Sequence, residues 1–197
     1  MKYQGTKTAF ADPLSYFKLD INNEKILKQM KTLDWKKIKR YQGTYGIEGL
    51  NLLDCFPELQ QEIKQASAFY FKKILECDAH FKLTTSWGTM TEPGGSSGRH
   101  YHSNAWFSGS YYPQDSSESP IRFHSPKIKL FSFDIKNYNP YTETTWTFSP
   151  SYNSLIIFPS YIGHEILLNQ SKVTRYSIAF NVFPKGTIGK EDSLITL

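Results

Sequence analysis

The patterned part of the chain ends with the stretch Arg175-Tyr176-Ser177-Ile178-Ala179-Phe180-Asn181-Val182-Phe183, which has the composition of a β-strand. Because alternate residues of a strand point to opposite faces, Arg175 and Ser177 share one face with Ala179 and Asn181. An otherwise apolar strand does not need an arginine and a serine on the same face. A buried arginine binds a carboxylate or phosphate through its planar set of donors, and a hydroxyl adds a further donor. The stretch therefore predicts a strand that carries an anion-binding pair.

Seven further strand candidates precede this stretch and determine the expected fold. Runs rich in Thr, Ile, Phe, Tyr and Trp alternate with Pro, Gly, Asn and Ser clusters at intervals of roughly ten residues, which is typical of an all-β sandwich or barrel. The candidates are Phe81–Met90, Trp106–Tyr112, Ile121–Phe123, Ile128–Phe133, Thr144–Phe148, Ser154–Phe158 and Glu165–Leu168.

Before residue 80 the apolar residues instead repeat with a helical period, in Asn22–Leu33 and Pro57–Glu76. We therefore predict a mainly β protein with N-terminal helices, in which a double-stranded β-helix, or jelly-roll barrel, is covered on one sheet face by the helices. The expected organisation is a single domain over residues 1–197, with helical support over 1–79 and the β barrel over 80–197.

The composition is that of a globular protein, with 16% aromatic and 21% charged residues among 197. Cys55 and Cys77 lie far apart and match no metal-binding spacing, so we expect them to be reduced and buried. Met1–Pro13 has no apolar core of signal-peptide length, and no apolar run could span a bilayer. We therefore expect a cytoplasmic protein that binds no membrane. The net charge is +5, but the basic run Lys36–Arg40 is typical of a solvated face, so nucleic acid is not an expected partner.

Three histidines are candidates for metal ligands. His100 and His102 lie two positions apart in Arg99-His100-Tyr101-His102-Ser103-Asn104, so both face one side if this segment is extended. His164 follows the apolar strand Ser154–Phe158 and begins another strand. Neutral imidazole is a common ligand of iron, zinc and copper. The pattern therefore indicates a metal site built from three separate imidazoles.

These motifs in this order resemble the iron(II)- and 2-oxoglutarate-dependent oxygenase superfamily, and in particular its small bacterial and phage members. In that superfamily a jelly-roll barrel holds iron between a His-x-Asp/Glu motif and a distal His, and an Arg-x-Ser pair binds the far carboxylate of the cosubstrate. The resemblance implies that iron(II) is held by His100, His102 and His164, and that 2-oxoglutarate is bound by Arg175 and Ser177. The blocks that carry it are Ser86-Trp87, His100-x-His102-x-Asn104, Phe107-Ser108-Gly109-Ser110-Tyr111-Tyr112, Phe158-Pro159-Ser160 and Arg175–Val182.

Two more residues complete the expected cofactor-binding set. Ser108, Ser110 and Tyr112 share one strand face, and this pattern fits the wall of a cosubstrate pocket in which Tyr112 donates to a carboxylate, whereas Tyr111 packs against the helices. Asn104 ends the His-x-His-x-Asn block, and it takes the carboxylate position if His102 is the proximal histidine.

One position departs from the superfamily, because His102 stands where an acid usually follows the proximal histidine. Three histidines can hold iron(II) with one negative charge fewer, which weakens metal retention, and they also suit zinc. Alternatively, only His100 and His164 are ligands, or His102 is a donor behind them. Asp134 and Glu165 are the acids nearest to the motifs and could supply the missing carboxylate.

The resemblance implies a dioxygenase that converts 2-oxoglutarate to succinate and carbon dioxide while it hydroxylates a C–H bond of a peptide or small molecule. One alternative is a cupin-like metalloprotein with other chemistry, in which Arg175 binds some other acid. Another is a jelly-roll that binds a ligand or partner without catalysis. A fold alone does not separate these functions.

Overall fold

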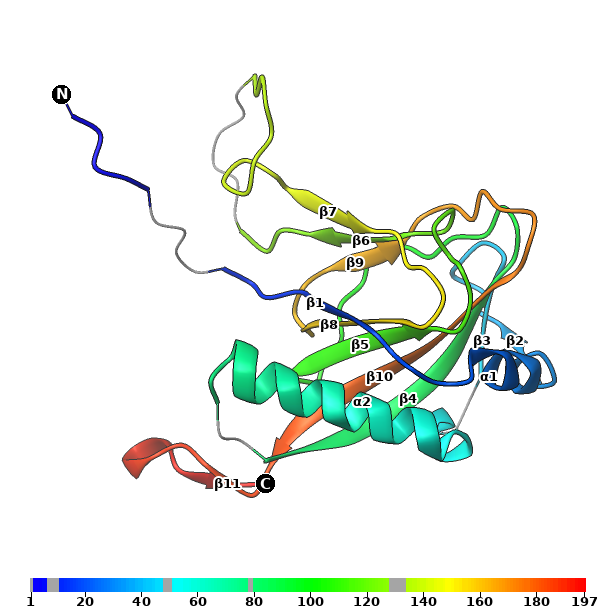
Figure 1. The fold of residues 1–197 in the computed structure, drawn as a ribbon, viewed down its shortest axis with the longest axis horizontal. Coiled ribbons are helices and arrows are strands. Elements are labelled where there is room, and N and C mark those ends of the chain that lie inside the picture. The colour runs from blue at the N-terminus through cyan, green and yellow to red at the C-terminus, as the bar shows by residue number, and fades with distance from the viewer. Residues whose placement is uncertain (1, 7–10, 48–50, 78–79, 128–133) are drawn as a thin grey trace.

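The computed structural model describes residues 2–6, 11–47, 51–77, 80–127 and 134–197. Two antiparallel sheets face each other, and helices cover the outer side of the larger one (Figure 1). The mainly β prediction with N-terminal helices is therefore confirmed. The predicted strand Ile128–Phe133 lies outside the described residues.

The large sheet has the strand order β1-β8-β5-β10-β4-β3-β2, and each strand pairs with its neighbours in antiparallel register. The small sheet has the order β7-β6-β9. In the described ranges, hydrogen bonding closes neither sheet into a barrel. The strands are β1 (Ser15–Lys18), β2 (Lys36–Lys37), β3 (Thr44–Gly46), β4 (His80–Thr91), β5 (Phe107–Tyr112), β6 (Ile121–His124), β7 (Thr145–Phe148), β8 (Ser154–Pro159), β9 (His164–Ile166), β10 (Arg175–Lys185) and the C-terminal hairpin β11 (Thr187–Ile188) and β12 (Ile195–Thr196).

Two α-helices precede the long strands. In α1 (Asn23–Met30) the Asn22 side chain accepts a hydrogen bond from the Lys25 N–H at 3.0 Å, which caps the helix. Helix α2 (Pro57–Phe69) begins with a proline, which suits the first turn of a helix, and continues as a π-helical turn over Tyr70–Ile74. Short 3₁₀ turns lie at Leu52–Cys55 and Glu191–Ser193. In the described ranges, every helix falls short of what a membrane span requires.

The main core lies between α2 and the outer face of the large sheet (Figure 1). Leu59 and Ile63 of α2 are fully buried there, and the Tyr70 ring packs edge-on against Phe107 of β5 with centroids 4.9 Å apart. The sheet contributes alternate residues: Phe107, Tyr111, Leu155, Ile157, Tyr176, Ile178, Phe180 and Val182. The residues between them on β5 and β10 therefore face the small sheet, as the alternation of Arg175 and Ser177 predicts.

A second, smaller core joins the two sheets. Ile156 and Phe158 of β8 contact Ile121 and Phe123 of β6, and the Phe123 and Phe158 rings lie 4.8 Å apart. This layer fills the space on one side of the inner face of the large sheet. Elsewhere on this inner face, Ser108, Ser110, Arg175 and Ser177 are buried polar residues.

The first 79 residues contain three strands that the pattern did not predict. Strands β1, β2 and β3 have four, two and three residues, which is too short for the period-two signal to show. Cys55 is exposed and Cys77 is half-buried, so the prediction that both cysteines are buried is wrong, although both are free. Cys55 ends the surface 3₁₀ turn, where its side chain meets solvent.

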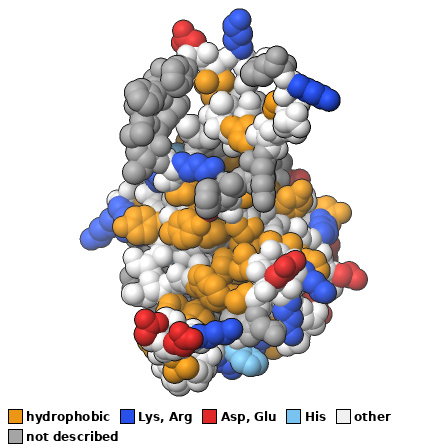
Figure 2. All heavy atoms as spheres, turned by 90° about the vertical axis from the view of Figure 1, so that its left-hand side faces the viewer, with side chains coloured by type: hydrophobic (Ala, Val, Ile, Leu, Met, Phe, Trp, Pro, Cys, Tyr) orange, Lys and Arg blue, Asp and Glu red, His pale blue; other side chains and the backbone are white. Residues whose placement is uncertain are grey.

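Hydrophobic side chains gather in a band across the face seen from the left of Figure 1, as Figure 2 shows. Two hollows in the described part of the molecule are both lined by Cys77 and Trp106. Among the described residues, neither hollow is lined by a histidine, so both hollows are separate from the candidate metal ligands.

Gly109 of β5 is required by the packing of Phe180. A Cβ at position 109 would lie 2.3 Å from Phe180 Cζ and 2.7 Å from the Ile156 carbonyl oxygen. We expect Gly109→Ala to lower the free energy of unfolding by about 1–3 kcal/mol, because the added methyl overpacks the core. Urea unfolding measures this. The control is Gly98→Ala, whose methyl would meet only the Tyr41 ring at 3.5 Å, and equal losses in both variants would contradict the packing argument.

Candidate metal and anion site

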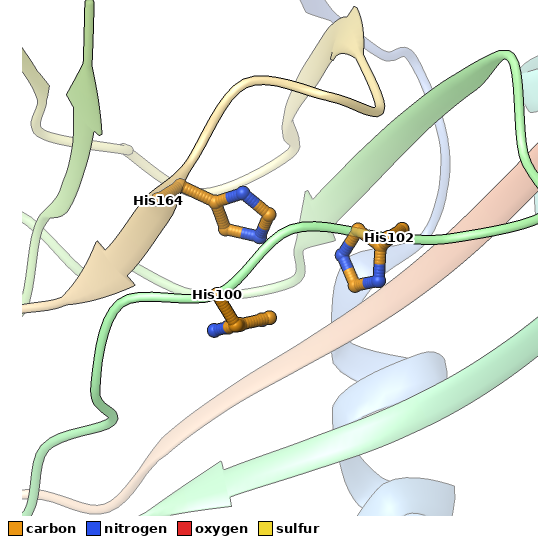
Figure 3. Close-up of side chains that lie close together, drawn as sticks. All are labelled: His100, His102 and His164. Atoms are coloured by element: carbon orange, nitrogen blue, oxygen red, sulfur yellow. The ribbon is translucent and has the colours of Figure 1, made fainter. Parts of the chain in front are cut away.

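The three predicted histidines lie together where the two sheets meet (Figure 3). His100 and His164 form an antiparallel bridge, in which the His100 N–H donates to the His164 carbonyl at 2.9 Å and the His164 N–H donates to the His100 carbonyl at 2.8 Å. The His102 N–H donates to the Ser160 carbonyl at 3.0 Å. One ring nitrogen from each histidine lies within 4.8 Å of the others. This spacing allows all three imidazoles to reach one ion.

Backbone carbonyls orient two of the three rings. His100 Nδ1 lies 2.9 Å from the Gly98 oxygen, and His164 Nδ1 lies 3.0 Å from the Ile162 oxygen. A carbonyl only accepts, so in the neutral ring Nδ1 carries the proton and Nε2 keeps its lone pair for a metal. The His102 ring instead packs against Trp87 at 5.2 Å between centroids. In the described ranges no hydrogen bond holds the His102 ring.

Burial lowers the pKa of all three histidines. The pKa of His102 falls to about 4, first from burial and then from the nearby His100 charge. The pKa of His164 falls to about 3 for the same reasons. Burial also lowers the pKa of His100; its bond to Gly98 opposes the shift, and the Arg40 charge adds to it. All three rings are therefore neutral near pH 7, as metal ligation requires.

Arg175 lies on the same inner face and is a buried cation without a counter-ion. Its side chain is 2% exposed, and Nη1 donates to Ser177 Oγ at 3.3 Å. Within the described part of the chain, its buried Nε and Nη2 atoms have no hydrogen-bond partner, and the same is true of the hydroxyl of Tyr112, whose ring lies 4.9 Å from the guanidinium carbon. Burial lowers the pKa of Arg175, yet a guanidinium stays charged in proteins. The unpaired donors therefore form a site that a carboxylate would complete.

The histidines and the arginine open into one cavity of about 330 Å³. Its inner wall includes Ser110 of β5 and Ser177 of β10, and its mouth includes Arg40 and Tyr41 from the turn between β2 and β3. The remaining lining residues are Ile38, Thr44, Trp87, Thr89, Ser97, His100, Tyr101, His102, Gly109, Ile121, Phe158, His164, Ile166, Arg175 and Ala179. A metal ion and an organic anion can thus meet in the same space.

The structure separates two of the predicted cofactor-binding residues from the cavity wall. Tyr112 lies beside the Arg175 guanidinium and is fully buried, behind the lining residues. Asn104 lies on an exposed turn after His102 with φ +56°, and it does not line the cavity. The structure therefore brings together the three histidines, Arg175 and Ser177, with Tyr112 behind them, but not Asn104.

Neither candidate acid replaces the missing carboxylate. Glu165 points away from the cavity, where its Oε1 lies 3.0 Å from His124 Nε2 and 3.8 Å from Arg122 Nη1. Asp134 is exposed and does not line the cavity. Among the described residues, the group of His100, His102 and His164 is the one cluster of three or more potential metal ligands. In the part of the chain that the structure describes, the site therefore offers three candidate nitrogen ligands and no acidic one.

Sequence reasoning missed the residues at the mouth. The run Lys36–Arg40 was expected to form a solvated face, but Arg40 and Tyr41 line the cavity. They lie there because β3 pairs with β4, with Thr44 opposite Thr91. No local pattern indicates a pairing between strands that are more than forty positions apart.

Residues 85–181 match a protein family described as "Putative 2OG-Fe(II) oxygenase". The match spans a little under half of the chain and contains the three histidines, Arg175 and Ser177. The predicted resemblance is therefore confirmed. No curated protein matches the sequence.

Solved structures share the fold at low sequence identity. HygX from Streptomyces hygroscopicus, solved with nickel, 2-oxoglutarate and hygromycin B, is 10% identical, with a TM-score of 0.64 over 87% of this chain and 82% of HygX. The α-ketoglutarate-dependent epimerase SnoN from nogalamycin biosynthesis is 11% identical, with a TM-score of 0.65 over 89% of this chain and 80% of SnoN. A Pseudomonas putida prolyl-4-hydroxylase is 12% identical, with a TM-score of 0.55 over 85% of this chain and 91% of that one. These likenesses confirm the predicted double-stranded β-helix fold.

The low pKa values of His102 and His164 predict an acid-sensitive metal-free protein. Unfolding restores the ordinary value of 6.5, so the unfolded chain binds more protons below that pH. The free energy of unfolding is therefore highest above about pH 6.5. As the pH is lowered, it decreases by up to about 1.4 kcal/mol per pH unit for each histidine, until the pH reaches the pKa values of the folded state. Urea unfolding in a chelator between about pH 7 and pH 5 measures the slope. We expect His102→Gln to reduce this slope, whereas His80→Gln, a control at an exposed position, should leave it unchanged. A slope in His102→Gln equal to that of the parent would contradict the prediction.

Proposed function

We propose that this protein, whose residues 85–181 match the 2OG-Fe(II) oxygenase family, uses iron(II) and 2-oxoglutarate to hydroxylate a C–H bond of a peptide or small molecule. One observation carries the proposal: a buried arginine without a counter-ion faces the same cavity as three neutral histidines. An oxygenase of this kind needs one place for a divalent metal and another for the far carboxylate of its cosubstrate. Both places lie in this one cavity.

The residues present fit both groups. His100, His102 and His164 offer three ring nitrogens within 4.8 Å of one another, and neutral imidazole suits iron(II). The unpaired Nε and Nη2 of Arg175 are the donors that a carboxylate accepts from in pairs, and the free hydroxyl of Tyr112 is a further donor nearby. A bound carboxylate would satisfy buried polar atoms that otherwise cost stability.

When bound, iron(II) and 2-oxoglutarate supply oxygen activation and the oxidising equivalents, with release of succinate and carbon dioxide. The residues of the chain would bind and orient the metal and the cosubstrate. Arg175 and Ser177 fix one end of the cosubstrate, while the carbonyls of Gly98 and Ile162 fix the ligand nitrogens of His100 and His164. The apolar Phe158, packed 4.8 Å from the His164 ring, keeps water from the rear of that ligand.

The ligand set also supports a second candidate. Three histidines without an acid suit zinc as well as iron(II), and a jelly-roll metalloprotein with other chemistry would use Arg175 for some other acid. The similar structures include an epimerase, so this fold also supports a reaction other than hydroxylation. Product analysis by mass spectrometry separates hydroxylation from epimerisation once a substrate is found.

We also propose that residues 1–197 form one domain. Strand β1 pairs with β8, and β3 pairs with β4, so the first 79 residues complete the large sheet. Arg40 and Tyr41 from this part line the cavity. Both observations support a site built from the whole chain.

Anaerobic titration with iron(II) and 2-oxoglutarate tests the proposed cofactors. We expect a visible charge-transfer band that needs both ligands. Arg175→Gln should weaken 2-oxoglutarate binding at least about tenfold, because a charged partner of a buried carboxylate is lost. Ser177→Ala should have a smaller effect, and neither variant should change iron binding measured alone. Metal binding without any response to 2-oxoglutarate would favour the second candidate.

Replacing His102 by aspartate tests whether it is a ligand. An anionic ligand attracts iron(II) more strongly than a neutral one, so His102→Asp should tighten iron(II) binding about tenfold and His102→Ala should weaken it. Competition with a chromophoric chelator under anaerobic conditions measures the affinity. His80→Asp adds the same charge at an exposed position and is the matched control. If both aspartate variants bind iron(II) like the parent, His102 does not touch the metal.

A further inference from the structure

Two arginines line the cavity, and the proposed function uses only one of them. Arg175 is at the buried end, whereas Arg40 is exposed on the turn between β2 and β3 and reaches the mouth. Of the described residues that line the cavity, none is an aspartate or glutamate. The ion pairs found within the described ranges do not include Arg40. The mouth therefore has a cationic side chain without a counter-charge.

Contacts with aromatic residues hold Arg40 near the metal ligands. Its guanidinium carbon lies 4.9 Å from the centre of the Tyr41 ring, and the Tyr41 ring lies 6.1 Å from the His100 ring. The Tyr41 ring also covers Gly98, since a Cβ there would lie 3.5 Å from Tyr41 Cε1. Arg40, Tyr41 and His100 thus lie in a row of neighbouring side chains that leads from the mouth to the histidine cluster.

The turn that carries Arg40 is anchored to the segment that leads to His100. The Ser96 N–H donates to the Gln42 carbonyl at 2.9 Å, and the Thr44 hydroxyl donates to the Ser96 carbonyl at 2.8 Å. The Glu92 N–H donates to the Gly43 carbonyl at 2.9 Å. These bonds hold the backbone of the turn that carries Arg40 beside the segment that leads to His100.

We propose that Arg40 binds an anionic group, a carboxylate or a phosphate, of the organic substrate. This inference rests on the proposed function, because it assigns Arg175 to the cosubstrate and leaves Arg40 for the substrate. A guanidinium pairs with either anion through two parallel N–H donors. The neighbouring Tyr41, Trp87 and Tyr101 offer aromatic surface to the apolar part of the same molecule. The substrate class is thus an organic acid or phosphate ester with an apolar or aromatic body.

Matched probe ligands test this assignment. The protein is loaded with nickel(II) and 2-oxoglutarate, and ligand-observed NMR line broadening gives the dissociation constants of phenylacetate, phenyl phosphate and the neutral phenylacetamide. A zinc(II)-loaded sample distinguishes paramagnetic broadening near the metal from binding elsewhere. The variants are Arg40→Gln and, as the matched control, Lys39→Gln, which removes the adjacent charge that does not line the cavity. Both positions are exposed, so neither change removes a buried contact.

We expect at least one anion to bind at least about tenfold more tightly than the amide, and the tighter of the two identifies the group. Arg40→Gln should bring this ratio to about one, while Lys39→Gln keeps it. The affinity for 2-oxoglutarate should stay the same in both variants.

Three results would overturn the inference: equal binding of anions and amide to the parent, an unchanged ratio in Arg40→Gln, or a loss of 2-oxoglutarate binding in Arg40→Gln as large as that in Arg175→Gln. The last would assign Arg40 to the cosubstrate. If the parent binds no 2-oxoglutarate, the proposed function fails separately. The anion and amide affinities are then measured in Arg175→Gln loaded with nickel(II) alone, with and without Arg40→Gln. A preference for the anion that is lost in Arg40→Gln still supports the anion site, and a preference that does not depend on Arg40 rejects it.

Discussion

The pair of backbone hydrogen bonds between His100 and His164 is the constraint on which the site depends. The two bonds, of 2.9 and 2.8 Å, join the segment that enters β5 of the large sheet to the first residue of β9 of the small sheet. Residues directly opposite in an antiparallel pair place their side chains on the same side of the ladder. The two imidazoles are therefore neighbours for the same reason that the sheets are joined, and His102 follows them because its own N–H is bound to Ser160.

The polar groups buried in the cavity destabilise the folded state, and apolar packing on the opposite face of the same strands offsets this loss of stability. Arg175 is buried with two unpaired nitrogen donors, which is unfavourable in the absence of an anion. The alternate residues Tyr176, Ile178, Phe180 and Val182 pack against α2 in a dense apolar layer. Strand β10 thus carries binding chemistry on one face and most of its stabilising contacts on the other. This division lets the inner face hold unsatisfied polar groups without loss of the fold.

The parts of the site that follow from strand alternation could be predicted, and those that depend on long-range pairing could not. Two-residue spacing fixes which of Arg175, Ser177, Ser108 and Tyr112 face inward once a strand is assumed, and the structure agrees. Arg40 gives no such signal, because its position depends on the pairing of the short strand β3 with β4. The motif predicts that Asn104 lies beside the cofactor, but this residue has a positive φ and lies on an exposed turn. Strand periodicity thus predicts which face of the sheet a side chain lies on, but it does not predict the course of a turn.

His102 stands where the resembling superfamily has an acid, and Arg40 has no acidic partner among the described residues. Both features make the cavity more positive. With three neutral ligands, a divalent metal keeps both of its positive charges, and Arg175 and Arg40 add two more without any carboxylate on the wall. A dianionic cosubstrate would neutralise only half of this charge. In a cavity whose low-dielectric walls strengthen electrostatic interactions, the remainder favours a second anion over a neutral or cationic molecule. If the three histidines hold the metal as proposed, the absence of an acidic ligand would weaken metal retention and would also favour the acidic substrate proposed for Arg40.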